Sequence, residues 1–69
     1  MKTWMKVERA KRDMSQSDLA KIMKVSRQTI NSIECDRFTP SVILALRIAK
    51  YFEKTVNEMF FLEEHDEPE

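Results

Sequence analysis

Glycine is absent from the 69 residues, and the chain has only two prolines, one cysteine and one histidine. A single cysteine, Cys35, excludes an intrachain disulfide, and with His65 it leaves little material for a metal centre or a histidine-based catalytic triad. We therefore expect no enzyme activity, no cofactor and no small-molecule ligand. No apolar run approaches the roughly 18 residues of a membrane-spanning helix, and the N-terminal residues lack the apolar segment of a signal peptide. We expect a cytoplasmic protein without a membrane partner.

Charge is balanced in total but distributed unevenly. The chain has 12 basic and 12 acidic residues, and the segment EEHDEPE, residues 63–69, holds five of the acids and no Lys or Arg. Residues 1–62 therefore combine 12 basic with 7 acidic residues, which gives them a charge of +5. The composition predicts one small basic domain over residues 1–62, followed by an acidic tail over residues 63–69 that we expect to be flexible.

All strong periodic signals are helical. Residues that favour helix N-caps precede four of the apolar segments: Ser15, Ser26, Ser41 and Thr55. Asp18 and Glu58 follow two of these caps by three residues, as in a capping box. The pattern predicts an all-α fold of five helices, over residues 4–12, 16–23, 26–36, 42–52 and 56–60.

The absence of glycine raises the question of how these helices end. Helices commonly end on a glycine in the left-handed conformation, and the positions where this chain would need one hold Asp13, Lys24, Asp36 and Glu53. At Lys24 and Glu53 that conformation should cost on the order of 1 kcal/mol each. Either the helices end differently or the fold offsets these costs.

The helices predicted over residues 16–23 and 26–36 are separated by a short turn, which is the spacing of a helix-turn-helix. In the second helix, Ile30 and Ile33 share one side. The opposite side carries Gln28, Asn31, Ser32 and Cys35. This polar side could simply be solvated, but it lacks Lys and Glu and holds the side-chain types that hydrogen-bond base edges in the DNA major groove. Composition alone leaves both interpretations open.

A resemblance favours the second interpretation. From Arg9 to Phe60, with SQSDLAKIMKVSRQTINSIE at its centre, the chain resembles the phage repressor and Cro-like helix-turn-helix family, also called the Xre family. The resemblance implies a five-helix lambda-repressor-like domain that binds double-stranded DNA as a homodimer, with its third helix in the major groove. Some small members pair their ends as two short strands, here residues 1–4 and 60–64.

The resemblance also implies roles for individual residues. DNA contacts fall on Gln16, Ser26, Arg27, Gln28, Thr29, Asn31, Ser32 and Arg37. Among these, Arg27, Gln28 and Ser32 occupy base-reading positions. Gln16 and Arg37 occupy backbone-contacting positions, and Arg9 with Glu34 corresponds to a structural ion pair. The chain departs from the family at the four helix ends without glycine, at Glu8, where an apolar residue is common, and at Cys35, where asparagine is common.

The fourth predicted helix is apolar over more of its circumference than one core face requires. Together with the apolar residues near the C-terminus, this excess predicts a dimer interface formed by Val42, Leu46, Met59, Phe60, Phe61 and Leu62. The resulting hypothesis is a transcriptional repressor that binds a palindromic operator. The alternative is an antitoxin-like module that mainly binds a protein partner and binds DNA secondarily.

Overall fold

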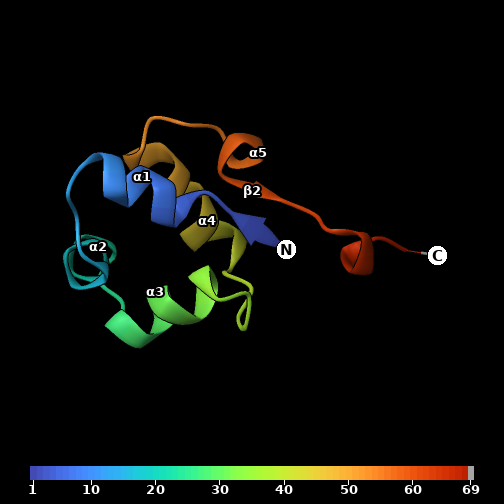
Figure 1. The fold of residues 1–69 in the computed structure, drawn as a ribbon, viewed down its shortest axis with the longest axis horizontal. Coiled ribbons are helices and arrows are strands. Elements are labelled where there is room, and N and C mark those ends of the chain that lie inside the picture. The colour runs from blue at the N-terminus through green and yellow to red at the C-terminus, as the bar shows by residue number, and fades with distance from the viewer. Residues whose placement is uncertain (69) are drawn as a thin grey trace.

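The computed structural model describes residues 1–68 and shows five helices with a small strand pair (Figure 1). The helices are α1 (Met5–Lys11), α2 (Gln16–Met23), α3 (Arg27–Glu34), α4 (Val42–Tyr51) and α5 (Val56–Met59). The strands β1 (Lys2–Thr3) and β2 (Phe60–Phe61) pair antiparallel, with Lys2 opposite Phe61. The predicted five-helix fold with a terminal strand pair is confirmed.

The helices begin where the sequence predicts. At α2, the Ser15 hydroxyl accepts from the Asp18 N–H at 3.0 Å, and the Asp18 carboxylate accepts from the Ser15 N–H at 2.9 Å. The other three caps, Ser26, Ser41 and Thr55, each accept from the backbone N–H three residues later. A cap of this kind contributes about 1 kcal/mol, so local chemistry alone largely sets these four starts.

The helices end without glycine, on four residues in the left-handed conformation. The φ angles are 54° at Asp13, 59° at Lys24, 59° at Asp36 and 58° at Glu53. The residue after each of them donates its N–H to the carbonyl five residues back, as Val25 does to Ala20 at 3.0 Å. This is the Schellman arrangement, which satisfies carbonyls that the helix end leaves open. Lys24 and Glu53 thus adopt the left-handed conformation despite its expected free-energy cost.

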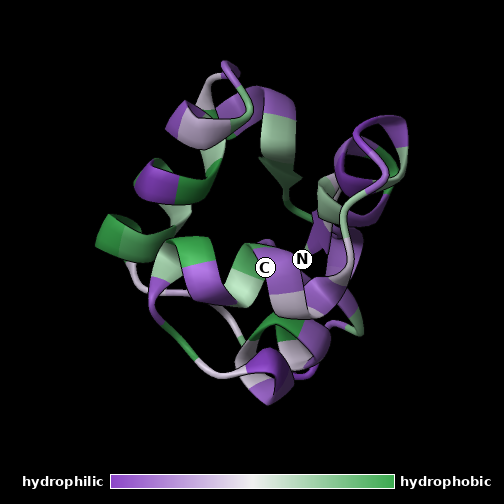
Figure 2. Cartoon of the chain, turned by 90° about the vertical axis from the view of Figure 1, so that its left-hand side faces the viewer, coloured by the Kyte–Doolittle hydropathy of each residue, from purple (hydrophilic) through white to green (hydrophobic). Residues whose placement is uncertain are grey.

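The core is a single apolar cluster to which every helix contributes. It comprises Met5, Leu19, Ala20, Met23, Ile30, Ile33, Ile48, Ala49, Phe52, Met59 and Phe60. The ribbons alternate hydrophilic and hydrophobic segments along the helices, as expected when each one buries a single face (Figure 2). Because α2 and α3 both pack on this cluster, the helix-turn-helix is fixed to the rest of the domain.

The acid Glu8 is packed into this interior. Glu8 is only 6% exposed and accepts hydrogen bonds from Arg12 at 2.9 Å and from Lys11 at 3.1 Å. These two cations hold the pKa of Glu8 below its ordinary value, with Arg12 the larger cause. Arg12 also lies over the ring of Phe52, 4.8 Å from its centroid. The position that is often apolar in the family is therefore filled here by a paired carboxylate.

The predicted acidic tail begins with a turn and not with an irregular segment. A short 3₁₀ helix, η1 (Glu64–Asp66), extends away from the helical body (Figure 1). The Asp66 carboxylate lies 2.6 Å from the amine of Met1 and accepts from the Glu63 N–H at 3.0 Å. Residues 63–66 thus have local structure that contacts the N-terminus, the flexibility of the tail stays a prediction, and residue 69 lies outside the described residues. Within residues 1–68, no helix has the length and apolar character needed to cross a membrane.

Candidate nucleic-acid interface

Helix α3 has one buried face and one open face. Ile30 and Ile33 are 0% and 2% exposed and attach the helix to the core. Ser26 caps the helix by accepting from the Thr29 N–H at 3.0 Å, and the two hydroxyls lie 2.8 Å apart. The helix is shorter than the predicted range of residues 26–36, because Ser26 is its cap and Cys35 and Asp36 already form the turn after it.

The open face holds side chains that are free to bind something else. Arg27 and Gln28 are exposed, and within residues 1–68 neither side chain forms a hydrogen bond. A shallow hollow of about 280 Å³ is lined by Ser26, Gln28, Thr29, Ser32, Arg37 and Phe38. The structure therefore brings five of the eight predicted DNA-contacting residues to one surface. Arg27 lies next to them in the chain, at the first position of α3.

The segment after α3 is folded back onto this surface. The N–H groups of Arg37 and Phe38 both donate to the Ser32 carbonyl, at 2.8 and 3.3 Å. The left-handed conformation of Asp36 makes this reversal possible. Arg37 is consequently held beside α3 although it lies outside this helix. Phe38 is 51% exposed in the same place, and no feature of the sequence pattern identified it as a site residue.

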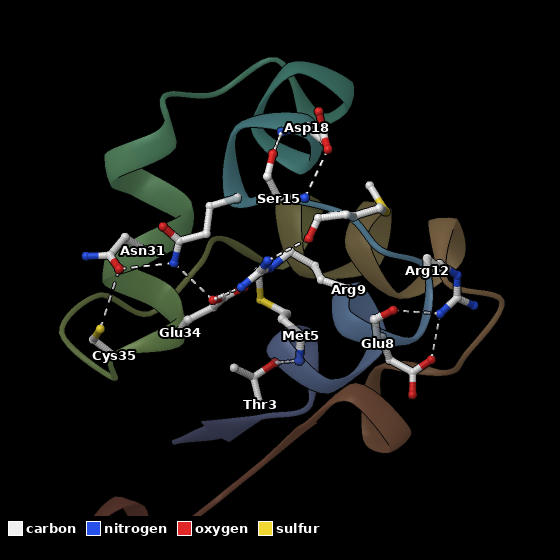
Figure 3. Close-up of polar contacts among 12 residues, drawn as sticks. Thr3, Met5, Glu8, Arg9, Arg12, Ser15, Asp18, Asn31, Glu34 and Cys35 are labelled. Carbon is white, nitrogen blue, oxygen red and sulfur yellow. Dashed lines mark hydrogen bonds and ion pairs between the residues drawn. The ribbon is translucent and has the colours of Figure 1, made fainter.

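The last turn of α3 is tied to α1 by a bidentate ion pair. Arg9 donates to Glu34 through Nε at 2.7 Å and through Nη2 at 2.8 Å, and its Nη1 donates to the Met14 carbonyl at 2.8 Å. Figure 3 shows the Arg9 side chain reaching from α1 to Glu34. The hydrogen bond to Glu34 raises the pKa of Arg9. This is the ion pair that the resemblance implies. Because it joins the last turn of α3 to α1, it stabilises the packing of α3 on the domain.

The Gln16 side chain joins the same hydrogen-bond network. Its amide nitrogen donates to Asn31 Oδ1 and to Glu34 Oε1, both at 3.1 Å. The Glu34 carboxylate can only accept, so the amide hydrogens must face α3. Asn31 Oδ1 also lies 3.7 Å from the Cys35 sulfur (Figure 3). The side chains of Gln16 and Asn31 therefore connect α2 to α3, and the phosphate contact expected at Gln16 stays a prediction.

The predicted interface between copies needs a similar correction. Val42 and Leu46 on α4 are 75% and 54% exposed, and Leu62 is 57% exposed. Met59 and Phe60, in contrast, are 0% and 5% exposed, because α5 and β2 turn these side chains into the core. These two residues are removed from the expected interface. Ile43 was not among the predicted interface residues, but it is 71% exposed beside Val42.

An apolar hollow lies beside the exposed residues of α4. Its volume is about 300 Å³, and it is lined by Met1, Thr39, Pro40, Val42, Ala45, Leu46, Val56 and Phe60. Neither Phe38 nor any predicted DNA-contacting residue lines it. The polar hollow on α3 and the apolar hollow beside α4 are therefore separate surfaces.

Comparisons with known proteins agree with the arrangement of α2 and α3. Residues 5–59 match the helix-turn-helix family. An HTH-type transcriptional regulator of Methanocaldococcus jannaschii is 42% identical over 66 residues, which cover 96% of this chain and all of the relative. One of Bacillus subtilis is 39% identical, with the same coverage. A third, from Archaeoglobus fulgidus, is 38% identical and matches 96% of this chain and 93% of its own length.

Proposed function

Because the chain belongs to the helix-turn-helix family of DNA-binding transcriptional regulators, we propose that it is a repressor that binds a palindromic operator as a homodimer. In this proposal α3 enters the major groove with its first turn leading. The observation that carries it is the set of exposed polar side chains around one hollow on α3, on the side away from the buried isoleucines.

Three residues are proposed to read bases. The Gln28 amide can pair with adenine through two hydrogen bonds, the Arg27 guanidinium can pair with guanine, and the Ser32 hydroxyl suits several acceptors. Gln28 and Arg27 occupy the first two positions of α3, where side chains of an inserted helix reach deepest. Because neither side chain has an intramolecular partner within residues 1–68, binding DNA breaks no existing hydrogen bond of theirs.

Other residues are proposed to position the helix on the phosphates. Ser26 and Thr29 present hydroxyls at the N-terminus of α3, and Arg37 supplies a charge beside it. The backbone N–H of Gln16, at the start of α2, provides a further donor for a phosphate. Asn31 is proposed to contact DNA through its amide nitrogen, which forms no hydrogen bond within residues 1–68, whereas its oxygen is occupied. A charge of +5 on residues 1–62 favours the approach to DNA.

The homodimer is proposed to form through the apolar surface of α4. Val42 and Leu46 are the centre of this surface, and Phe61 and Leu62 extend it, with 37% and 57% of their areas exposed. Ile43 is added to the set, since it is exposed beside them. A two-fold dimer that places its recognition helices about 34 Å apart would read two inverted half-sites one turn of DNA apart. Such a complex would cover a promoter and exclude polymerase, which is the basis for proposing repression.

The decisive experiment for the operator is selection of bound sequences from random duplexes at fixed salt concentration. We expect an inverted repeat whose half-sites are centred about one helical turn apart. Enrichment of single half-sites, or of no sequence at all, would contradict the dimeric operator. Binding of the selected duplex should also weaken steeply with salt, because each neutralised phosphate releases counterions.

Replacement of Gln28 by alanine tests the reading role directly. Loss of its paired hydrogen bonds should weaken binding by about 1–3 kcal/mol in each half-site and relax the preference for one base pair. Val7→Ala is the control, because Val7 is exposed on α1 and lines neither the hollow on α3 nor the one beside α4. Unchanged affinity and base preference in a folded Gln28→Ala protein would show that this residue does not read DNA.

The apolar hollow on α4 also fits the alternative of a protein partner, as in an antitoxin. Light scattering of the purified chain separates the two ideas. A dimer that Leu46→Glu converts to a monomer would support the homodimer. A monomer that binds DNA as one unit, and forms a stoichiometric complex with another protein through α4, would support the alternative.

A further inference from the structure

Phe38 is an exposed aromatic residue on the hollowed surface of α3. Its side chain is 51% exposed and lies outside the core cluster, although a phenyl ring gains free energy by leaving water. It lines the hollow on α3 together with Gln28 and Ser32. It does not line the apolar hollow on α4. The ring therefore belongs to the proposed DNA-facing surface and not to the proposed contact between copies.

The backbone holds Phe38 in this position. Its N–H and that of Arg37 both donate to the Ser32 carbonyl, at 3.3 and 2.8 Å. Before them, the Asp36 N–H donates to the Ile33 carbonyl at 3.1 Å, and Asp36 is left-handed with φ at 59°. After them, Pro40 is buried. The ring is thus carried by a segment anchored on both sides, so little backbone ordering remains to be done when DNA binds.

The neighbours of the ring indicate which DNA group it meets. An amide such as Gln28 reads adenine at N6 and N7, and the thymine paired with that adenine displays its C5 methyl group in the same groove. This methyl is the apolar group that the major groove offers, and phenylalanine is a side chain that contacts it. A phenyl ring next to an amide across one hollow therefore matches the two halves of an A·T pair, or of two adjacent pairs.

From this juxtaposition we propose that Phe38 is a specificity-determining residue that packs against a thymine methyl group beside the base read by Gln28. The inference rests on the proposed function, because it requires α3 to lie in the major groove. It adds to that function a hydrophobic contact from outside the recognition helix. Under this proposal the operator is selected partly by an apolar group and not only by hydrogen bonds.

Substitution of uracil for thymine tests the contact, since uracil keeps the base pairing and removes only the methyl group. Each thymine of the selected half-site is replaced in turn, and the affinity of the full chain is measured for every duplex. We expect one thymine per half-site at which the change weakens binding by about fourfold, the value of one buried methyl group. The same series is then measured with Phe38→Ala and with Phe38→Leu.

If Phe38 contacts the thymine methyl group, the loss of affinity caused by uracil must depend on the side chain at position 38. Phe38→Ala should bind the thymine duplex more weakly than the wild type does, and replacing the contacted thymine by uracil should no longer reduce its affinity. Phe38→Leu, whose side chain is still apolar, should keep part of the affinity difference between thymine and uracil. Val7→Ala is the control, because Val7 is an exposed apolar residue on α1 and should leave the whole profile unchanged.

Two failures are distinguishable in this design. If Phe38→Ala shows the same ratio of thymine to uracil affinity as the wild type at every position, Phe38 does not contact a thymine methyl, and the proposed function is untouched. If the wild type selects no DNA sequence, the proposed function fails, and this inference fails with it. Because Phe38 is half exposed, the alanine variant should keep the thermal stability of the wild type.

Discussion

Helices α2 and α3 have the same length and the same type of N-cap, but their first turns differ in charge. Each has eight residues and begins after a serine that accepts from the N–H of the third helical residue. In α2 that third residue is Asp18, whose carboxylate completes a capping box. In α3 it is Thr29, and the first turn contains no acid. Instead, α3 opens with Arg27.

This difference has a physical meaning. An acid in the first turn stabilises a helix by about 0.3–1 kcal/mol through the helix dipole. In α3 the same acid would stand on the hollowed surface that we propose to face DNA phosphates. Helix α2 is thus capped for stability, whereas α3 forgoes part of that stabilisation and keeps the N-terminus of the helix positive.

The largest expected effect comes from breaking the link that holds α3 to the scaffold. Arg9→Met would leave Glu34, whose side chain is 4% exposed, without its cation. We expect a loss of about 3 kcal/mol in the free energy of unfolding, because an unpaired buried charge is costly. Denaturant unfolding measures it.

Arg27→Met is the matched control for this change. It should leave the free energy of unfolding nearly constant and weaken DNA binding, because Arg27 is exposed and forms no hydrogen bond within residues 1–68. Equal destabilisation by the two variants would contradict the division between scaffold and reading surface.

The next effect comes from making α3 resemble α2. Thr29→Asp would install the missing acid, and the fold should become more stable by a few tenths of a kcal/mol. Binding to operator DNA should weaken by roughly 2 kcal/mol, since the new charge would face phosphates. Titration of labelled operator duplex measures this loss.

Thr29→Asn separates charge from shape in that experiment. Asparagine has nearly the size of aspartate and can also accept a capping hydrogen bond, but it is neutral. It should therefore retain most of the DNA affinity. If Thr29→Asp binds DNA as well as Thr29→Asn does, the first turn of α3 does not face phosphates.

A smaller effect is expected in the turn between the two helices. Lys24 has φ at 59°, and Lys24→Gly would remove the strain of that conformation. We expect a gain of about 0.5–1 kcal/mol in the free energy of unfolding. Lys21→Gly, inside α2, should instead cost about 1 kcal/mol, because glycine there only adds backbone freedom to the unfolded chain. Thermal unfolding of both variants measures whether glycine stabilises the fold at position 24 and destabilises it at position 21. Destabilisation by both substitutions would contradict the strain at Lys24.

The smallest effect concerns pH. Hydrogen bonds from the backbone and side chain of Ser15 lower the pKa of Asp18, and those of Thr55 lower the pKa of Glu58. A carboxyl group with a lowered pKa in the folded state stabilises the fold above its ordinary pKa, near pH 4. This stability should disappear as the pH falls through the lowered values. Denaturant unfolding from neutral to acid pH should show a shallower decline for Asp18→Asn and Glu58→Gln, and an unaltered decline would contradict the capping role of the carboxylates.

The features that local chemistry controls could be predicted from the sequence. Helix starts follow from a serine or threonine that can accept one backbone hydrogen bond, and helix ends from the hydrogen-bond pattern of the last turn. For this reason Ser15 and Ser26 were predictable as caps, whereas Lys24 was only a candidate for the left-handed conformation that the structure shows. The short turn between two capped segments predicted the helix-turn-helix of α2 and α3, and the family resemblance supported it.

Features that depend on packing between distant segments could not be predicted in this way. The sequence placed Met59 at an interface, but pairing of β2 with β1 turns the end of α5 inward. The hydrogen bond from Gln16 to Glu34 could not be predicted, because Glu34 lies within reach only after α2 and α3 have packed. Phe38 escaped notice because its position depends on a chain reversal at Asp36, not on helical periodicity.

The most direct test of the central claim, that Gln28 reads DNA while Asn31, bonded to Gln16, helps to hold α3 on the scaffold, is a comparison of selected operators. Sequences bound by the wild type, by Gln28→Ala and by Asn31→Ala would be selected from the same random duplexes. The account predicts that Gln28→Ala loses the preference at one base pair of each half-site and that Asn31→Ala selects the wild-type sequence. A wild-type preference in Gln28→Ala, together with an altered one in Asn31→Ala, would contradict it.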